Sequence, residues 1–223
     1  MILQLRGVEH AYRRTVALRG VSLAVESEEV VAITGPSGCG KSTLLHVAAG
    51  ILRPQAGDVT LLGEALTTLS ETARARLRRR SVGVVLQFGQ LVPDLSALEN
   101  VALPLLLERH DRAAALTAAR EWLERVGITA ERDTLAAELS GGEAQRVAVA
   151  RALVTGPAIV FADEPTGSLD TAGGEALMTL LLGAARERGA ALVVVTHDNV
   201  VAAHADREVR LRDGRVEAEA ALR

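Results

Sequence analysis

The chain has 223 residues, of which 48% are hydrophobic and 24% are charged, so it can bury one substantial core. Its formal net charge of −3 excludes a global electrostatic attraction to nucleic acid. No apolar run approaches the roughly 20 residues that a membrane-spanning helix needs. The first residues turn polar too early for a secretory signal peptide, and the single cysteine excludes an intrachain disulfide. These features favour one domain in a reducing cytoplasm.

Short strands separated by turn residues are predicted at the start of the chain. Their expected ranges are 2–6, 21–25, 30–34 and 58–62. The densest basic stretch, Arg74–Arg80, is interpreted as the solvated face of a short helix. Aromatic side chains do not interleave with these arginines, which argues against a nucleic-acid site.

The strand at residues 30–34 runs directly into a complete phosphate-binding loop of the form G-x-x-x-x-G-K-[ST], and a helix follows. The loop residues are Gly35, Pro36, Ser37, Gly38, Cys39, Gly40, Lys41, Ser42 and Thr43. Glycines allow successive N–H groups to point at a polyphosphate, and the helix adds its positive N-terminal end. Lys41 can reach the β- and γ-phosphates, and the Ser42 hydroxyl can ligate Mg²⁺. The sequence therefore predicts binding of a nucleoside triphosphate with Mg²⁺.

The same loop holds the only cysteine of the chain. Because Cys39 lies beside a helix N-terminus and a lysine, we expect its thiolate to be favoured and the thiol to be reactive. The side chain is not expected to be needed for catalysis, but modification of the thiol is expected to block the site.

The middle of the chain shows helical periodicity from about residue 96 to residue 153, with Leu98, Val101 and Leu105 on one face. Near-continuous apolar runs at 82–86, 159–162 and 192–196 predict parallel strands that are covered on both faces. The pattern therefore predicts an all-helical insert between two halves of one α/β core. Near the C-terminus, Asp213 and Gly214 mark a hairpin turn between two antiparallel strands.

A second small loop rich in N–H groups opens a helix at residues 139–143, where Ser140 is predicted to be the N-cap. The adjacent Gly141 and Gly142 leave this helix start accessible. The chain thus has two helix N-termini that could each bind an anion, which is more than one nucleotide needs. We therefore expect the second loop to complete the nucleotide site of another copy of the chain.

Two adjacent carboxylates end the apolar run at residues 159–162. Asp163 is expected to hold Mg²⁺ through water, as the acid at the end of this strand does in phosphate-loop enzymes. Glu164 is placed to orient or deprotonate the attacking water. The sequence thus predicts hydrolysis as well as binding of the nucleotide.

With these motifs in this order, the sequence resembles the ATP-binding-cassette (ABC) ATPases from Leu3 to about Val216. Residues 139–143 match the signature motif of that family, and residues 165–170 resemble its D-loop. The segments 91–101 and 162–170 are similar to the branch that powers macrolide efflux, lipoprotein release and the cell-division ABC complex.

The resemblance implies roles for further residues. His197 corresponds to the switch histidine that contacts the γ-phosphate, and Gln87 corresponds to the Q-loop glutamine that reaches the metal and the lytic water. Tyr12 matches the aromatic residue that stacks on adenine, although a core tyrosine is an alternative. The nucleotide-binding residues also include Ser140, Gly141, Gly142 and Asp170.

The fold class that the resemblance implies is α/β. A phosphate-loop NTPase core, with a RecA-like mostly parallel sheet and an antiparallel β part, is expected to carry an inserted α-helical subdomain. Within one ABC ATPase domain spanning residues 1–223, the core is expected in 1–87 and 156–223. The helical subdomain with the signature motif is expected in 88–155.

The implied function is that of an ATP-binding and ATP-hydrolysing subunit. Two copies are expected to dimerise head to tail around two ATP molecules and to drive a separate membrane-spanning permease, of export or extraction type, at the cytoplasmic face of the membrane. One alternative is a non-translocating signalling complex of the cell-division type. Another is a soluble ABC ATPase that acts on DNA or ribosomes, but such proteins usually carry tandem cassettes or a long coiled-coil insertion. No nucleic-acid partner is expected.

Overall fold

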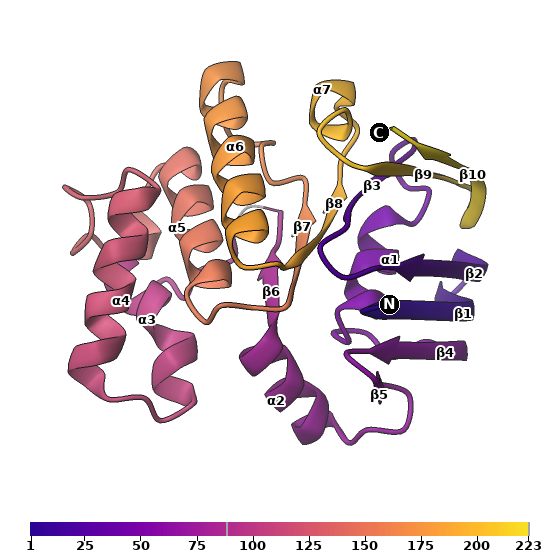
Figure 1. Ribbon diagram of the computed structural model, residues 1–223, viewed down its shortest axis with the longest axis horizontal. Coiled ribbons are helices and arrows are strands. Elements are labelled where there is room, and N and C mark those ends of the chain that lie inside the picture. The colour runs from indigo at the N-terminus through magenta and orange to yellow at the C-terminus, as the bar shows by residue number, and fades with distance from the viewer. Residues whose placement is uncertain (88, 223) are drawn as a thin grey trace.

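Two β-sheets and a set of helices build the chain, which the computed structural model describes over residues 1–87 and 89–222 (Figure 1). The larger sheet has the strand order β10-β9-β3-β8-β7-β6. Its strands are β3 (Val30–Thr34), β6 (Val82–Val85), β7 (Ile159–Asp163), β8 (Ala191–Val195), β9 (Arg207–Arg212) and β10 (Arg215–Ala221). All neighbouring pairs are parallel except β9 and β10, which form the predicted C-terminal hairpin. The order places the carboxyl ends of β3, β8, β7 and β6 side by side.

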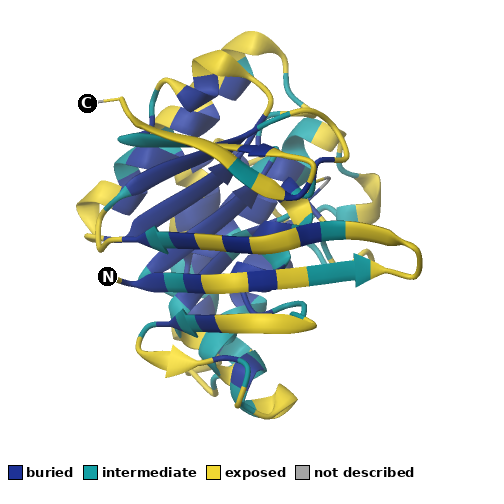
Figure 2. Cartoon of the chain, turned by 90° about the vertical axis from the view of Figure 1, so that its right-hand side faces the viewer, coloured by how far each residue is buried: buried dark blue, intermediate teal, exposed yellow. Residues whose placement is uncertain are grey.

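The smaller sheet is antiparallel and has the order β2-β1-β4-β5. Its strands are β1 (Leu3–Tyr12), β2 (Thr15–Val25), β4 (Ala56–Leu61) and β5 (Glu64–Ala65). Buried and exposed residues alternate along much of β1 and β2, as expected for a sheet with one solvated face (Figure 2).

Two groups of helices flank the larger sheet. α1 (Lys41–Ala48) and α2 (Glu71–Ser81) precede β6. The predicted insert contains α3 (Ala97–Leu107), α4 (Arg112–Arg125), the 3-10 turn η1 (Ala136–Glu138) and α5 (Gly141–Leu153), and the chain then adds α6 (Thr171–Glu187) and α7 (Asn199–Ala202). In Figure 1, α3, α4 and α5 lie to the left and the smaller sheet to the right, with β6, β7 and β8 between them.

The core is split in two because successive residues of a strand point to opposite faces. On β3, Val30 and Ala32 pack in a cluster with α3 to α6, whereas Val31 and Ile33 pack with α1 and the smaller sheet. Every residue of β3, β7 and β8 is buried, which explains their near-continuous apolar sequences. The predicted α/β fold with parallel and antiparallel β parts is therefore confirmed.

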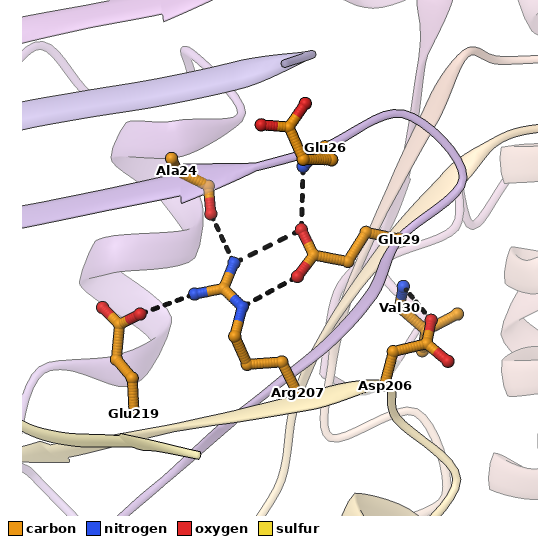
Figure 3. A network of polar contacts seen from close by, with 7 residues as sticks. All are labelled: Ala24, Glu26, Glu29, Val30, Asp206, Arg207 and Glu219. Atoms are coloured by element: carbon orange, nitrogen blue, oxygen red, sulfur yellow. Dashed lines mark hydrogen bonds and ion pairs between the residues drawn. The ribbon is translucent and has the colours of Figure 1, made fainter. Parts of the chain in front are cut away.

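An arginine ties the C-terminal hairpin to the turn between β2 and β3 (Figure 3). The guanidinium of Arg207 donates to both carboxylate oxygens of Glu29, at 2.7 and 3.3 Å, and to the carbonyl of Ala24 and a carboxylate oxygen of Glu219. The hydrogen bonds that Arg207 donates to Glu29 raise the pKa of Arg207, and burial opposes the rise. The contacts fix β9 beside β3, whose other end leads into the phosphate-binding loop.

Candidate nucleotide-binding site

Four loops meet at one edge of the larger sheet, because each follows the carboxyl end of a parallel strand. The phosphate-binding loop follows β3, His197 follows β8, Glu164 follows β7 and Gln87 follows β6. The backbone N–H of Glu164 donates to the carbonyl of Val195 at 2.9 Å, so the ladder between β7 and β8 continues into the site. Residues far apart in the sequence are thereby brought to one place.

The phosphate-binding loop depends on glycine at two close approaches of the backbone. Gly35 has φ +142°, and a Cβ at this position would lie 2.1 Å from the carbonyl oxygen of Leu211. Gly40 has φ +108°, and a Cβ there would lie 2.3 Å from the carbonyl oxygen of Ala17. Any other side chain at either position would therefore force the loop away from its neighbouring strand.

Helix α1 presents its N-terminus to this loop. Its N-cap is Gly40, which supplies no side-chain hydrogen bond to the first turn. The N–H groups of that turn are consequently available to phosphate oxygens. Lys41 is 8% exposed, and its Nζ donates to the carbonyls of Gly35 at 2.7 Å and Pro36 at 3.0 Å. The ammonium group is thus held over the loop, where a β- or γ-phosphate would lie. Ser42 is exposed at the same helix start.

Asp163 is the last residue of β7 and is 3% exposed. Its Oδ1 atom is buried and has no hydrogen-bond partner among the described residues. A buried carboxylate oxygen without a partner is unusual and indicates a site for an outside donor or cation. The charge of Asp163 also reaches His46 on α1, where it counteracts the lowering of the histidine pKa by burial.

Glu164 and His197 form a pair. The Nδ1 atom of His197 lies 2.8 Å from Oε1 of Glu164, whose side chain is 15% exposed. Glu164 has φ +47°, an uncommon conformation for a residue with a side chain, and such conformations concentrate at functional sites. The carboxylate is thereby directed towards His197, the second residue after β8.

Gln87 and Tyr12 both occupy exposed positions. Gln87 lies in the turn after β6. Tyr12 ends β1, is 48% exposed, and makes an edge-to-face contact with His10 at 4.8 Å between ring centroids. The alternative that Tyr12 is a core residue is therefore wrong.

Ser140 begins α5 through a capping box, as the sequence predicted for an N-cap. Its hydroxyl accepts from the N–H of Glu143 at 3.3 Å, and the Glu143 carboxylate accepts from the N–H of Ser140 at 2.7 Å. Hydrogen bonds from Ser140 lower the pKa of Glu143. The D-loop supports this helix start, because the Ser168 hydroxyl donates to the Gly141 carbonyl at 3.2 Å. A Cβ on Gly142 would lie 2.9 Å from Leu169.

Asp170 has a local partner in addition to its predicted role at the nucleotide. It is the N-cap of α6, and its Oδ1 accepts from the N–H of Gly173 at 2.8 Å. The structure therefore gives Asp170 a part in starting this helix.

Cys39 differs from the expectation of a reactive thiol. Its side chain is 6% exposed and belongs to the core cluster beneath the loop, with Leu18 and Leu211. A Cβ built on Gly35 would lie 3.0 Å from the sulfur, so the thiol points under the loop and not towards the phosphates. The expectation was wrong because proximity in sequence to a helix N-terminus does not decide which side of the loop a side chain takes.

Two residues that the sequence patterns did not single out hold the segment after β6. Arg151 on α5 donates to the carbonyls of Gly89 at 2.9 Å and Gln90 at 3.1 Å, and burial lowers its pKa. Asn100 on α3 is fully buried, and it accepts from the N–H of Val92 at 2.8 Å. Residues 89–92 are thus anchored to both the signature helix α5 and α3. A signal for Asn100 was present in the sequence, since a polar residue interrupts an apolar helix face there.

The phosphate loop, the strand order and the two acids define a phosphate-loop NTPase. The sequence profile described as "ABC transporter" matches residues 18–167, and the chain belongs to that family. It is accordingly an ATP-binding and ATP-hydrolysing subunit, as the resemblance implied.

Relatives match over nearly the whole length of the chain. The lipoprotein-releasing system ATP-binding protein LolD 2 of Caulobacter vibrioides is 47% identical, with 97% of this chain and 96% of the relative covered. The lipoprotein-releasing system ATP-binding protein LolD of Bordetella pertussis is 49% identical, with coverages of 92% and 88%. Among solved structures, the dimeric ATP-binding cassette MJ0796 bound to ADP and Pi has a TM-score of 0.96 at 37% identity, with 100% of this chain and 99% of that chain covered.

Proposed function

We propose that this chain is the ATPase subunit of a lipoprotein-releasing complex, in which it drives a separate membrane-spanning partner from the cytoplasmic face of the membrane. The observation that carries this proposal is the name shared by relatives from Caulobacter, Shewanella and Bordetella, all between 45% and 49% identical and matched over at least 88% of their length. Among the residues described, the chain has no helix long and apolar enough to cross a bilayer.

ATP binds, in this proposal, between the loop after β3 and the acids after β7. Tyr12 contacts the adenine, and the loop N–H groups with Lys41 contact the phosphates. The remaining loop residues, with Ser140, Gly141, Gly142 and Asp170, contribute as the sequence predicts. The uncapped start of α1 and the position of the Lys41 ammonium support this placement.

Mg²⁺ fits the polar groups at this edge of the sheet. Ser42, Gln87 and Asp163 would hold it, and the buried Oδ1 of Asp163 without a protein partner supports this assignment. When bound, the cation would supply positive charge that offsets the negative charge of the nucleotide phosphates.

Hydrolysis is assigned to Glu164, which accepts a proton from the attacking water. The imidazole of His197 orients the Glu164 carboxylate through their 2.8 Å contact, and its exposed ring would contact the γ-phosphate. Gln87 contributes to the placement of the water. These roles follow from the adjacency of the three strand ends.

A second copy completes each site in a head-to-tail dimer. Ser140 and Gly141 are exposed at the start of α5 and are therefore accessible to a second copy of the chain. The N–H group of Gly141 and the Ser140 hydroxyl proton would reach the γ-phosphate held by the partner. Closure then depends on that phosphate, and hydrolysis removes the bridge. The dimeric structures of MJ0796 support the proposed arrangement.

The membrane partner is assigned to a groove between α2, α3 and α5, on the side of the proposed helical subdomain. This apolar groove, with a volume of about 390 Å³, is lined by Leu86, Leu103 and Leu107, with Arg79 and Arg151 at its border. Because Leu86 directly precedes Gln87, a movement of the nucleotide site would be transmitted to a protein that occupies the groove.

The test is reconstitution of the subunit in vesicles with the membrane proteins encoded beside it and a lipidated substrate protein. ATP-dependent release of the lipidated protein is expected, and Glu164→Gln should abolish it. Co-purification and ATP hydrolysis without release would contradict the proposal and favour a signalling complex of the cell-division type. Failure to co-purify with any membrane protein would favour a soluble ABC ATPase.

A further inference from the structure

A hollow of about 470 Å³ lies between the C-terminal part of α2 and the end of α3, and arginines dominate its lining. The residues that form this arginine hollow are Arg76, Arg79, Arg80, Leu107, Glu108 and Arg109. None of them belongs to the nucleotide site. Four guanidinium groups and one carboxylate leave the hollow with three uncompensated positive charges.

The one carboxylate in the hollow, that of Glu108, already accepts hydrogen bonds from two of the arginines. Oε1 of Glu108 accepts from Nε of Arg79 and Oε2 accepts from Nε of Arg80, each at 2.5 Å, and the Glu108 side chain is 10% exposed. These bonds lower the pKa of Glu108, first through Arg80 and then through Arg79. Glu108 therefore positions the two arginines and has little capacity left to repel an anion.

The other two arginines are free to bind. Across residues 1–87 and 89–222, neither the Arg76 side chain nor the Arg109 side chain forms a hydrogen bond or an ion pair. Arg109 has φ +64° just after α3, a position that glycine fills with less strain. Arg109 thus combines an unfavourable backbone conformation with a guanidinium group that has no partner among the described residues. Arginine is suited to phosphate because its planar fork presents several N–H donors.

The rim adds an apolar side chain to the cations. Leu107 is 54% exposed, and together with Arg79 it lines both the arginine hollow and the apolar groove assigned above to the membrane partner. Cationic side chains beside exposed apolar ones are the combination that binds the interface of an anionic bilayer. If a membrane-embedded protein occupies the groove, the adjoining hollow lies on the side of the subunit that faces this protein and its membrane.

We propose that the arginine hollow binds the phosphate groups of anionic phospholipids at the membrane surface. This inference rests on the proposed membrane-peripheral function and adds a direct lipid contact of the ATPase subunit itself. The alternative occupant of the hollow is an acidic segment of the membrane partner, and the experiment distinguishes this segment from a phospholipid.

The experiment measures co-sedimentation of the purified subunit with phosphatidylglycerol-containing vesicles and with phosphatidylcholine vesicles at low ionic strength. Binding is expected only to the anionic vesicles, and it should weaken as salt is added. In the triple variant Arg76→Gln, Arg80→Gln, Arg109→Gln, the affinity should fall about a hundredfold, because each arginine near an anionic surface contributes about fivefold.

A second triple variant provides the matched control. Arg120, Arg186 and Arg215 are exposed on α4, α6 and β10, and their substitution by Gln removes the same charge from other faces. Vesicle binding should be largely kept in this control, and both triple variants should hydrolyse ATP like the wild type. Equal losses in the two variants would overturn the proposal, and so would absence of wild-type binding to anionic vesicles.

Co-purification with the membrane partner provides a further measurement. If the first triple variant loses co-purification with the membrane partner while vesicle binding is unchanged, the hollow binds a protein segment and the lipid assignment is wrong. If the subunit supports lipoprotein release but its vesicle binding does not depend on vesicle charge, only the inference of lipid binding is contradicted. Charge-dependent vesicle binding without lipoprotein release would contradict only the proposed function.

Discussion

The Nδ1 atom of His197 lies 2.8 Å from Oε1 of Glu164, although 33 positions separate the two residues in the sequence. Pairing of β7 with β8 brings them together, since Asp163 lies opposite Val195 and each strand then ends. The carboxylate is mostly buried and the imidazole mostly exposed. One strand end therefore supplies the carboxylate that we propose as the base, and its neighbour supplies the imidazole that contacts it.

Glu164→Gln should keep ATP binding while lowering the rate of hydrolysis about 10²- to 10⁴-fold, because an amide cannot accept the proton of the attacking water. Single-turnover hydrolysis and nucleotide-binding assays measure the two effects. Glu175→Gln on the exposed surface of α6 is the control and should be silent. A Glu164→Gln enzyme with near-normal turnover would remove Glu164 from the role of base.

His197→Ala should lower kcat about 10- to 100-fold with little change in ATP affinity, since the base is kept but loses its orienting partner. His197→Gln should recover part of the activity because its amide can still donate to the carboxylate. His110→Ala, at an exposed position between α3 and α4, is the matched control. The role fails if His197→Ala changes only KM.

Ser140→Asp separates the structural role of Ser140 from its proposed role at the partner's nucleotide. Aspartate caps a helix about as well as serine, so the stability should change by less than about 1 kcal/mol. Its charge would face the γ-phosphate of the partner, so ATP-driven dimerisation in the Glu164→Gln background should be lost. Size-exclusion chromatography with and without ATP measures the dimer.

The control for this substitution is Ser96→Asp. Ser96 begins α3 through the same kind of capping box, with Glu99 in the place of Glu143. The substitution therefore introduces the same local charge without a proposed nucleotide contact. If Ser96→Asp blocks ATP-driven dimerisation as strongly as Ser140→Asp does, the composite site is not supported.

Local motifs predicted much of the fold and of the site. The phosphate-binding loop was recognisable because its glycines are required by backbone contacts that any such loop makes, as at Gly40. The strand that ends in Asp163 was evident from its continuous apolar sequence. The capping residue Ser140 was also readable, because its side chain bonds only three residues ahead.

Contacts between segments that are distant in the sequence could not be predicted from local motifs. The bonds from Arg151 to Gly89 and Gln90 join positions about sixty residues apart, and only the order of strands and helices brings them together. The orientation of Cys39 depends on the packing of Leu211 from the C-terminal hairpin. Short elements such as β5 and α7 lack a pattern long enough to recognise.

The buried position of Cys39 predicts slow labelling by maleimide in the folded protein, at a rate that rises at least about a hundredfold on unfolding. Cys39→Ala should retain ATP hydrolysis, because the side chain faces the core and not the phosphates. In that background, Ser37→Cys places a thiol at an exposed loop position, where labelling should be fast and ATP should protect it. Rapid labelling of native Cys39 would contradict the buried position.

Arg207→Ala should lower the free energy of unfolding by about 2 to 3 kcal/mol, somewhat less than the loss expected for a fully buried ion pair. The reason is that Glu29, 17% exposed, and the carbonyl of Ala24 would lose their donor together (Figure 3). Arg212→Ala removes an ion pair with Glu217 on the same hairpin, but both side chains there are well exposed, so its cost should stay below about 1 kcal/mol. Urea unfolding of both variants and of Glu29→Ala, with the double variant, gives the coupling energy of the pair. If Arg207→Ala lowers the free energy of unfolding no more than Arg212→Ala does, the contacts of Arg207 do not contribute to stability.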